Sequence, residues 1–242
     1  MSNIRQSIKQ YFSSTHTLLY SYLISLPLLL LYEVLIFLAQ PDSEQVVRIS
    51  VDVWIKTLFS YFGRDVLSIT LILVALFGMV VLYRERKKLS LLKLNYFFTM
   101  LIEASFYAFF LALLINTTVS GLLQVVQISP IESLTTLQQL ALSLGAGIYE
   151  ELFFRVILVS ALLFIFKKVF AKQSIAFASA ILLAALIFSL VHYVGVFGDP
   201  FTLSSFLFRF LFGLALNAIY LWRGFGMAAW THAIYDLMII AY

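Results

Sequence analysis

Long apolar runs separated by short polar segments make up most of the chain after residue 17. Several of these runs approach or exceed the roughly 20 residues that an α-helix needs to cross a bilayer. They cover residues 18–38, 66–83, 96–119, 140–166, 175–193, 201–220 and 225–241. The pattern predicts an all-α integral membrane protein, a bundle of about seven transmembrane helices.

Two segments between the predicted spans have a mixed character. Residues 39–65 are polar and charged but carry Trp54 and Tyr61, which suit the membrane interface, so a helix lying on the surface is one interpretation. Residues 122–139 contain a turn and then a capped helix start that enters the membrane. The sequence has no internal repeat and no dividing linker, so residues 1–242 are predicted to form one polytopic domain.

The composition supports a membrane protein, because 62% of the residues are hydrophobic and only 12% are charged. Soluble domains carry about 25% charged residues. The absence of cysteine excludes disulfides, thiolate metal sites and a cysteine nucleophile. The net charge of +4 does not indicate a nucleic-acid partner. The polar N-terminus lacks a signal-peptide cleavage site, so the helix over 18–38 is expected to be retained.

Lysine and arginine residues are unevenly divided between the two predicted membrane faces. Eleven fall at the N-terminus and after the second, fourth and sixth spans, whereas Arg48, Lys56 and Arg64 fall on the opposite side. Cytoplasmic loops carry the excess of basic residues. The distribution predicts a cytoplasmic N-terminus and an outward-facing C-terminus, and we expect a bacterial plasma membrane.

Ionisable residues at membrane depth are functional candidates, because each costs about 2.5–3.5 kcal/mol to insert. The first half of the chain offers only Glu33 and Glu103 in predicted spans. The second half is richer, and its candidates are Glu150, Glu151, Arg155, His192, Arg209, His232 and Asp236. The chemistry is therefore predicted to lie in the last four spans.

Helical spacing groups these candidates. Glu151 and Arg155 are four residues apart and share a helix face, so an ion pair is expected. Glu150 is rotated by about 100° from Glu151 about the helix axis, so it points elsewhere and has no obvious local partner. His232 and Asp236 are also four residues apart, close enough for the carboxylate to orient the imidazole. The paired acid, Glu151, is then expected to be structural, and the unpaired acid, Glu150, is expected to take part in the reaction.

Three short motifs occur in order inside the predicted spans. They read Glu150-Glu151-Leu-Phe-Phe-Arg155, Phe188-Ser-Leu-Val-His192 and His232-Ala-Ile-Tyr-Asp236. Together they resemble the CPBP intramembrane proteases, which are similar to the CAAX prenyl endopeptidase of the endoplasmic reticulum and include bacterial members linked to bacteriocin processing or immunity. Any one motif is weak evidence for the family, because short patterns recur by chance, but the three in order are a specific signal. The resemblance covers about residues 140–237.

The resemblance implies a role for each motif residue. Glu150 and His192 would hold and activate the attacking water, and His232 and Asp236 would stabilise the oxyanion. The acid–arginine pair of the first motif would be structural. One residue departs from the prenyl endopeptidases, which carry asparagine where this chain has Asp236. An ionised aspartate cannot donate to an oxyanion, so it orients His232 or is protonated.

Two mechanisms remain open for this set of residues. Glu150, His192 and His232 could bind zinc with water as the fourth ligand, and members of the family have been described as metalloproteases. The chain lacks a His-x-x-x-His pair on one helix. We therefore favour a glutamate mechanism with no cofactor over a zinc metalloprotease.

The predicted function is an intramembrane endopeptidase that cleaves a membrane-associated peptide or protein. The alternative is a non-proteolytic immunity factor or a proton-coupled transporter that uses the same polar residues. Simpler interpretations also stand: Glu150 and His192 as interfacial residues, and His232 with Asp236 as a hydrogen-bonded pair between helices.

Distances along straight helices conflict with a single site. At 1.5 Å per residue, Glu150 and His192 lie about 25–30 Å from the basic ends of their helices, whereas His232 lies about 13 Å from Arg223. A tilted helix or a displacement near Gly224 is required if these residues are to meet.

Overall fold

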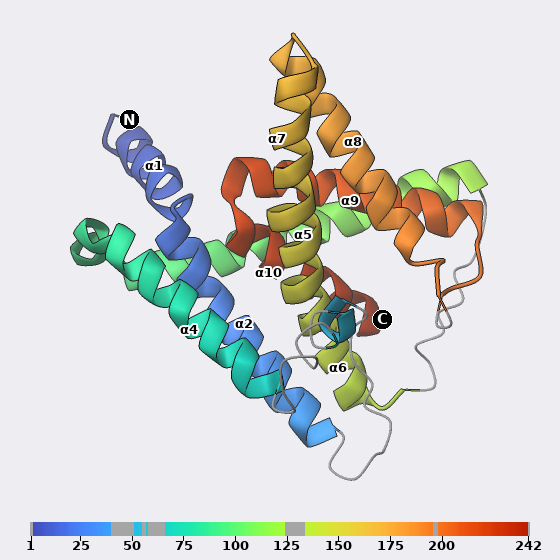
Figure 1. The fold of residues 1–242 in the computed structure, drawn as a ribbon, viewed down its shortest axis with the longest axis horizontal. Helices are drawn as coiled ribbons and strands as arrows, with labels where there is room; N and C mark the ends of the chain where they lie inside the picture. The colour runs from blue at the N-terminus through green and yellow to red at the C-terminus, as the bar shows by residue number, and fades with distance from the viewer. Residues whose placement is uncertain are drawn as a thin grey trace.

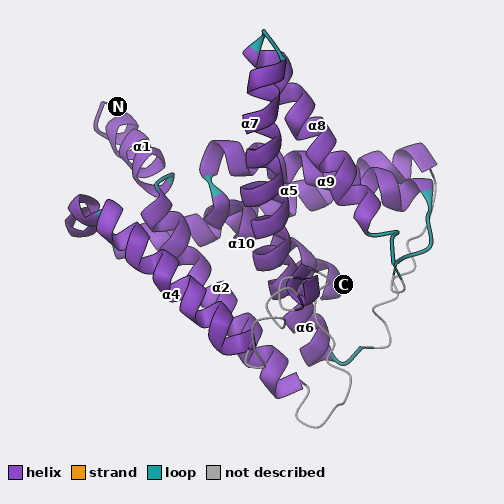
Figure 2. Ribbon diagram, in the orientation of Figure 1, coloured by secondary structure: helices purple, strands orange, loops and turns teal. Residues whose placement is uncertain are grey.

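The chain folds into a set of packed helices, with no strand among the described residues (Figures 1 and 2). The structure is a computed structural model, and it describes residues 2–39, 51–54, 57, 66–123, 134–195 and 198–241. Helices are the expected outcome, because only internally hydrogen-bonded helices or closed barrels satisfy the backbone in a lipid environment.

The helices follow the predicted spans closely. The elements are α1 (Ser2–Thr15), α2 (Leu18–Ala39), α4 (Val66–Arg84), the 3-10 helix η1 (Arg86–Leu91), α5 (Leu94–Leu123), α6 (Thr136–Gly145), the π-helices η3 (Ala146–Glu150) and η4 (Leu152–Val159), α7 (Ser160–Val169), α8 (Gln173–Val191), α9 (Leu203–Arg223) and α10 (Phe225–Ile240).

Seven membrane spans are not confirmed, although a helix occupies each predicted range. In the described residues, four helices are both long and apolar enough to cross a membrane: Leu18–Ala39, Leu94–Ile115, Gln173–Val191 and Leu203–Arg223. Helix α10 has 16 residues and is therefore about 24 Å long, less than the hydrocarbon thickness of about 30 Å. The predicted span at 140–166 is divided among α6, η3, η4 and α7.

The two ambiguous segments are only partly described. Within 39–65 the structure describes Ala39, a helical piece at 51–54 and Thr57, so Tyr61 and the basic residues at 48, 56 and 64 lie outside the described part. Within 122–139, the predicted cap is present. Thr135 accepts from Gln138 N, and Gln138 Oε1 accepts from Thr135 N, which closes a capping box at the start of α6.

Helix α10 lies in the middle of the assembly and packs on α2, α5, α6, η3 and α9 (Figure 1). The Trp230 Nε1–H donates to the Ile24 carbonyl of α2 at 2.7 Å, which fixes α10 against the first long helix. Helices α7 and α8 pair with each other, and α8 packs on α9. Asn217 of α9 links these two helices, since its Nδ2 donates to the Ile181 carbonyl of α8 at 3.0 Å.

The exposed face of α5 is as apolar as its buried face. On α5, Phe98, Ile102 and Phe106 are spaced by four residues and are between 62% and 71% exposed, whereas Met100 and Ala104 on the opposite face are fully buried. A helix that is hydrophobic all round is typical of a membrane span. With the four long apolar helices, this identifies the chain as an integral membrane protein.

The N-terminal helix α1 is held to the bundle by a buried ion pair. Arg223, the last residue of α9, is 1% exposed and forms an ion pair with Glu103 of α5 at 2.7 Å. Tyr11 donates to the same carboxylate, and Thr15 accepts from Arg223. Burial and the Glu103 carboxylate raise the pKa of Tyr11 above its ordinary value, so the phenol keeps its proton.

This ion pair corrects one step of the sequence analysis. Arg223 was counted among the loop cations and used as a depth marker for His232. It is instead buried between α1 and α5, where Glu103 and Thr15 are its partners.

Candidate active site

The first motif lies where the helix that runs from α6 to α7 changes its winding. Residues 146–150 and 152–159 form π-helical turns, in which the backbone bonds skip one residue more than in an α-helix. Such turns are rare, and they are frequent at functional sites. They place Glu150, Glu151 and Arg155 in the protein interior, where they are 7%, 0% and 0% exposed.

Glu151 and Arg155 form the ion pair that their spacing predicts, with 2.8 Å between Arg155 Nη1 and Glu151 Oε1. The guanidinium also lies over the Phe188 ring, 4.5 Å from its centroid. Its nitrogens have no well-aligned hydrogen bond to a described residue. Coulomb attraction and the aromatic face therefore hold this charge, and its removal would leave Glu151 without its cationic partner.

Glu151 also contacts the third motif, which the sequence analysis did not anticipate. His232 Nδ1 lies 2.7 Å from Glu151 Oε1, whereas His232 Nε2 lies 3.5 Å from Asp236 Oδ2. The second distance is longer than a well-formed hydrogen bond. The close carboxylate partner of His232 is therefore Glu151 on another helix, rather than Asp236 on its own.

A glycine allows these two helices to meet. A Cβ at Gly147 would lie 2.6 Å from the Ala229 carbonyl oxygen and 2.6 Å from the Ala233 Cβ of α10. Small residues let helix backbones approach closely in membranes. This contact brings η3 against α10 one turn away from His232, so the Glu151–His232 bond follows from the missing side chain at position 147.

The second motif ends α8. His192 follows the last residue of the helix, and its Nδ1 lies 2.7 Å from the Phe188 carbonyl oxygen. A carbonyl can only accept, so Nδ1 carries the hydrogen in this contact and the neutral ring presents the lone pair of Nε2. His192 is thus oriented as a proton acceptor or ligand.

A polar cluster fixes the loop that follows His192. The Asp199 N–H donates to the His192 carbonyl at 2.8 Å, and the Asp199 side chain pairs with Arg209 of α9. Arg209 also donates to the Tyr193 hydroxyl at 3.0 Å, which in turn donates to Ser205. The acidic partner of Arg209 is therefore Asp199, and this pair ties α9 to the end of α8.

Glu150 differs from its neighbour in its contacts. Within the described part of the chain, its carboxylate makes no hydrogen bond or ion pair, although it is 7% exposed. The charged groups with the strongest Coulomb interaction with the Glu150 carboxylate are His232, Glu151, Arg155 and Arg209. The acid with no local partner on its own helix thus lies within electrostatic range of one charged residue of α9 and one of α10.

The structure brings the three motifs together around one aromatic ring. Phe188 makes edge contacts with both His192, at 5.1 Å between centroids, and His232, at 6.2 Å. His232 is 4% exposed, whereas the Asp236 side chain is 30% exposed and His192 is half-buried. The inner part of the cluster, around His232, is therefore buried. Its outer edge, formed by His192 and Asp236, is an accessible rim.

The candidate zinc ligands do not form a ready coordination sphere. Among the described residues, no three side chains of histidine, aspartate or glutamate are grouped so as to hold a metal ion. His232 directs Nδ1 at Glu151, which leaves Nε2 free, and Glu150 makes no hydrogen bond to either histidine.

An apolar cavity of about 440 Å³ lies on the other side of the motif-bearing helix. It is bounded by α2 and α4 and by residues of η3 and η4, among them Ile148, Tyr149 and Leu152. Tyr149 is the residue before Glu150, and its hydroxyl donates to Glu33 of α2 at 2.9 Å. Glu33, one of the two acids in the predicted spans of the first half of the chain, thus lies close to the motif segment.

Sequence reasoning missed two parts of this site. One is the second bond of Glu151, because a contact between α10 and η3 has no signal in local spacing. The other is Asp199, which belongs to the short loop between two predicted spans. Its only signal was Arg209, an arginine in a predicted span with no acid three or four residues away.

Comparison with known proteins bears on this cluster directly. Residues 132–238 match the family model of the Rce1-like type II CAAX prenyl endopeptidases. The matched range is somewhat less than half of the chain and contains all three motifs. No curated protein and no solved structure gives a significant match. The match confirms the resemblance to the CAAX protease family that the motifs predicted.

Proposed function

We propose that this membrane protein, whose residues 132–238 carry the sequence pattern of the CAAX protease family, is an intramembrane endopeptidase. It would hydrolyse a peptide bond of a membrane-associated protein or peptide. The observation that carries the proposal is the meeting of three motifs from separate helices at one buried cluster with an accessible rim.

In this proposal Glu150 and His192 activate water. The carboxylate of Glu150 takes a proton from the water while the oxygen of that water attacks the scissile carbonyl carbon. The Nε2 lone pair of His192 helps to hold that water, since Nδ1 is engaged by the Phe188 carbonyl. Glu150 then gives the proton to the leaving amine as the C–N bond breaks. A positioned acid–base group of this kind contributes about 10²–10⁴-fold in rate.

The oxyanion of the tetrahedral intermediate would be stabilised by His232 and Asp236. Because Nδ1 of His232 is directed at Glu151, only Nε2 faces the reacting space, and it donates when the ring is doubly protonated. Glu151 is then a positioning residue that fixes the orientation of the imidazole. Donors to an oxyanion are typically worth about 2.7–4 kcal/mol each.

Substitution of Asp236 separates its two candidate roles. An asparagine is expected to keep kcat/KM within about fivefold of the wild type, because its amide can donate to the oxyanion, whereas Asp236→Ala is expected to lose about 10²-fold. Both rates would be measured on protein in lipid nanodiscs with one substrate. Equal loss in the two variants would show that the carboxylate itself is needed.

We favour hydrolysis by this glutamate mechanism without a metal. The support is that no three histidine, aspartate or glutamate side chains of the described residues are grouped so as to hold a metal ion. Elemental analysis of the purified protein, together with activity measured after chelation, tests this choice. Stoichiometric zinc that is lost together with activity would contradict it.

The substrate class we propose is a peptide that reaches the site from the membrane. The apolar cavity beside Tyr149 borders the motif-bearing helix and would accommodate a hydrophobic segment. We place the protein in a bacterial plasma membrane with a cytoplasmic N-terminus, in line with the basic residues. A secreted peptide precursor or a bacteriocin-related target fits this location better than a prenylated protein.

The decisive experiment compares membrane peptides from cells that carry the wild-type protein or its Glu150→Gln variant. Peptides with new termini that appear only with the wild type would identify substrate and cleavage site. Identical peptide profiles, with both proteins equally abundant in the membrane, would favour a non-proteolytic immunity factor or transporter.

A further inference from the structure

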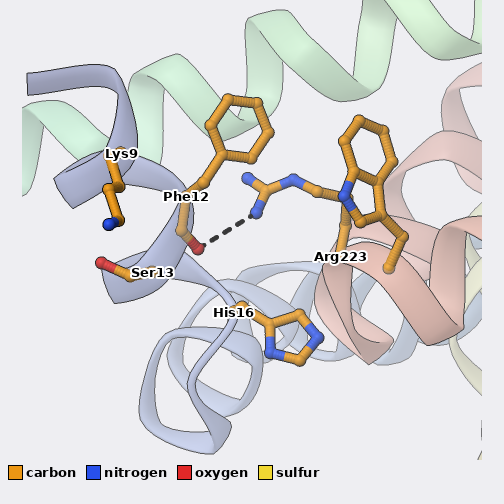
Figure 3. Close-up of a pocket in the computed structure, with 6 residues that line it drawn as sticks. Lys9, Phe12, Ser13, His16 and Arg223 are labelled. Atoms are coloured by element: carbon orange, nitrogen blue, oxygen red, sulfur yellow. Dashed lines mark hydrogen bonds between the residues drawn. The ribbon is translucent and has the colours of Figure 1, made fainter. Parts of the chain in front are cut away.

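A cavity of about 380 Å³ lies where the N-terminal helix meets the end of α9, away from the motif cluster (Figure 3). Its lining consists of Lys9, Phe12, Ser13, His16, Trp222 and Arg223. The lining combines basic groups and a hydroxyl with two large aromatic side chains. This composition suits a ligand with an anionic part and an apolar part.

The basic side of the cavity comes from one face of α1. Lys9 and Ser13 are four residues apart and share a helix face, His16 directly follows the helix, and all three are exposed. Lys9 makes no ion pair with a described acid. The acid of this region, Glu103, is occupied by Arg223, Tyr11 and Tyr107. The positive charge of Lys9 therefore remains uncompensated at the cavity.

Arg223 closes the inner end of the cavity and is already fully engaged. Its guanidinium lies 4.4 Å from the centroid of the Phe12 ring and donates to the Phe12 carbonyl at 3.5 Å (Figure 3). A ligand would meet Lys9, Ser13 and His16 first and would add charge complementarity to this end of the bundle. Lysine is a common phosphate ligand that acts as a point charge.

The position of the cavity fits the membrane–water interface. Helix α1 directly precedes the long apolar α2, and its opposite face carries Ile4 and Ile8, which are 68% and 52% exposed. A helix with one apolar and one basic face lies in the interface plane. Trp222, at the mouth of the cavity, is 61% exposed, and tryptophan is enriched at this level.

We propose that this cavity binds the phosphate-bearing headgroup of an anionic phospholipid. Lys9, Ser13 and His16 would contact the phosphate, while Phe12 and Trp222 would pack against the first carbons of the lipid. Free phosphate would use the basic groups but not the aromatic ones. The bound lipid would hold α1 on the corner at Gly224, where α9 ends and α10 begins.

Native mass spectrometry of the full chain in detergent tests this site. Phosphatidylglycerol, phosphatidylcholine and inorganic phosphate would be titrated separately onto the wild type, Lys9→Gln and the control Lys172→Gln, which removes an exposed lysine between α7 and α8. We expect one phosphatidylglycerol to bind the wild type and the control in preference to phosphatidylcholine, and to bind Lys9→Gln about fivefold more weakly. Circular dichroism would check that the variants keep their helices.

Two outcomes would overturn the proposal. Equal phosphatidylglycerol affinity of Lys9→Gln and the wild type would show that the lipid binds elsewhere. Displacement of the lipid by millimolar inorganic phosphate would show a site for free anions. The readout is binding and does not depend on hydrolysis, so the result is independent of the proposed protease activity.

Discussion

The Glu150→Gln variant is expected to lose about 10²–10⁴-fold in kcat/KM while it accumulates in the membrane to the wild-type level. Glutamine has nearly the shape of glutamate, so the packing around η3 is preserved. It cannot take the proton from the attacking water. Because Glu150 makes no hydrogen bond or ion pair to a described residue, the substitution breaks no structural contact among them.

A matched control makes this result specific. Glu85 pairs with Lys88 at the surface, far in sequence from the motifs, and Glu85→Gln removes the same charge. Rates would be measured in lipid nanodiscs with a substrate from the membrane-peptide comparison, and abundance by immunoblot. Loss of activity only in the Glu150 variant supports its role as general base. Full activity of Glu150→Gln would end the protease hypothesis.

The Arg155→Met variant is expected to lower the free energy of unfolding by about 3–5 kcal/mol. Both side chains of the Glu151–Arg155 pair are 0% exposed. Removal of one partner of such a pair leaves the other charge buried and uncompensated, which is the costly step. The measurement is unfolding in a mixed-micelle denaturant titration, followed by circular dichroism.

Two further variants test this explanation. The double variant Glu151→Gln with Arg155→Met removes both charges and should be less destabilised than Arg155→Met alone. Lys88→Met breaks an ion pair whose lysine is 49% exposed, and exposed pairs contribute about 0–1 kcal/mol. A double variant as unstable as Arg155→Met would mean that the shape of the arginine, rather than its charge, holds the segment.

The helices and the cluster of motifs were predictable because both leave local signals. Apolar runs of sufficient length must become helices in lipid, and each predicted range contains one. The three motifs converge as expected, although straight-helix distances argued against it. Arg223 was counted as a loop cation, since its buried ion pair with Glu103 is a tertiary contact that a positive charge near a helix end does not reveal.

The winding of the motif segment was not predictable in the same way. A rotation of 100° per residue assumes an α-helix, whereas residues 146–150 and 152–159 have π-helical bonds. The segment contains no proline, and its single glycine at 147 marks a close approach rather than a change of winding. The bond between Glu151 and His232 depends on that approach, so it could not be inferred from either motif alone.

The close approach at Gly147 also bears on how the sequence of this protein could diverge. Any side chain at 147 would collide with the backbone of α10, so we expect natural relatives to keep glycine at this position. The outward positions on α5, such as Phe98, Ile102 and Phe106, only need to remain compatible with lipid. Substitutions that adapt the protein to a different bilayer can thus occur on the outer helices. The spacing between Glu150, Glu151 and His232 would stay the same.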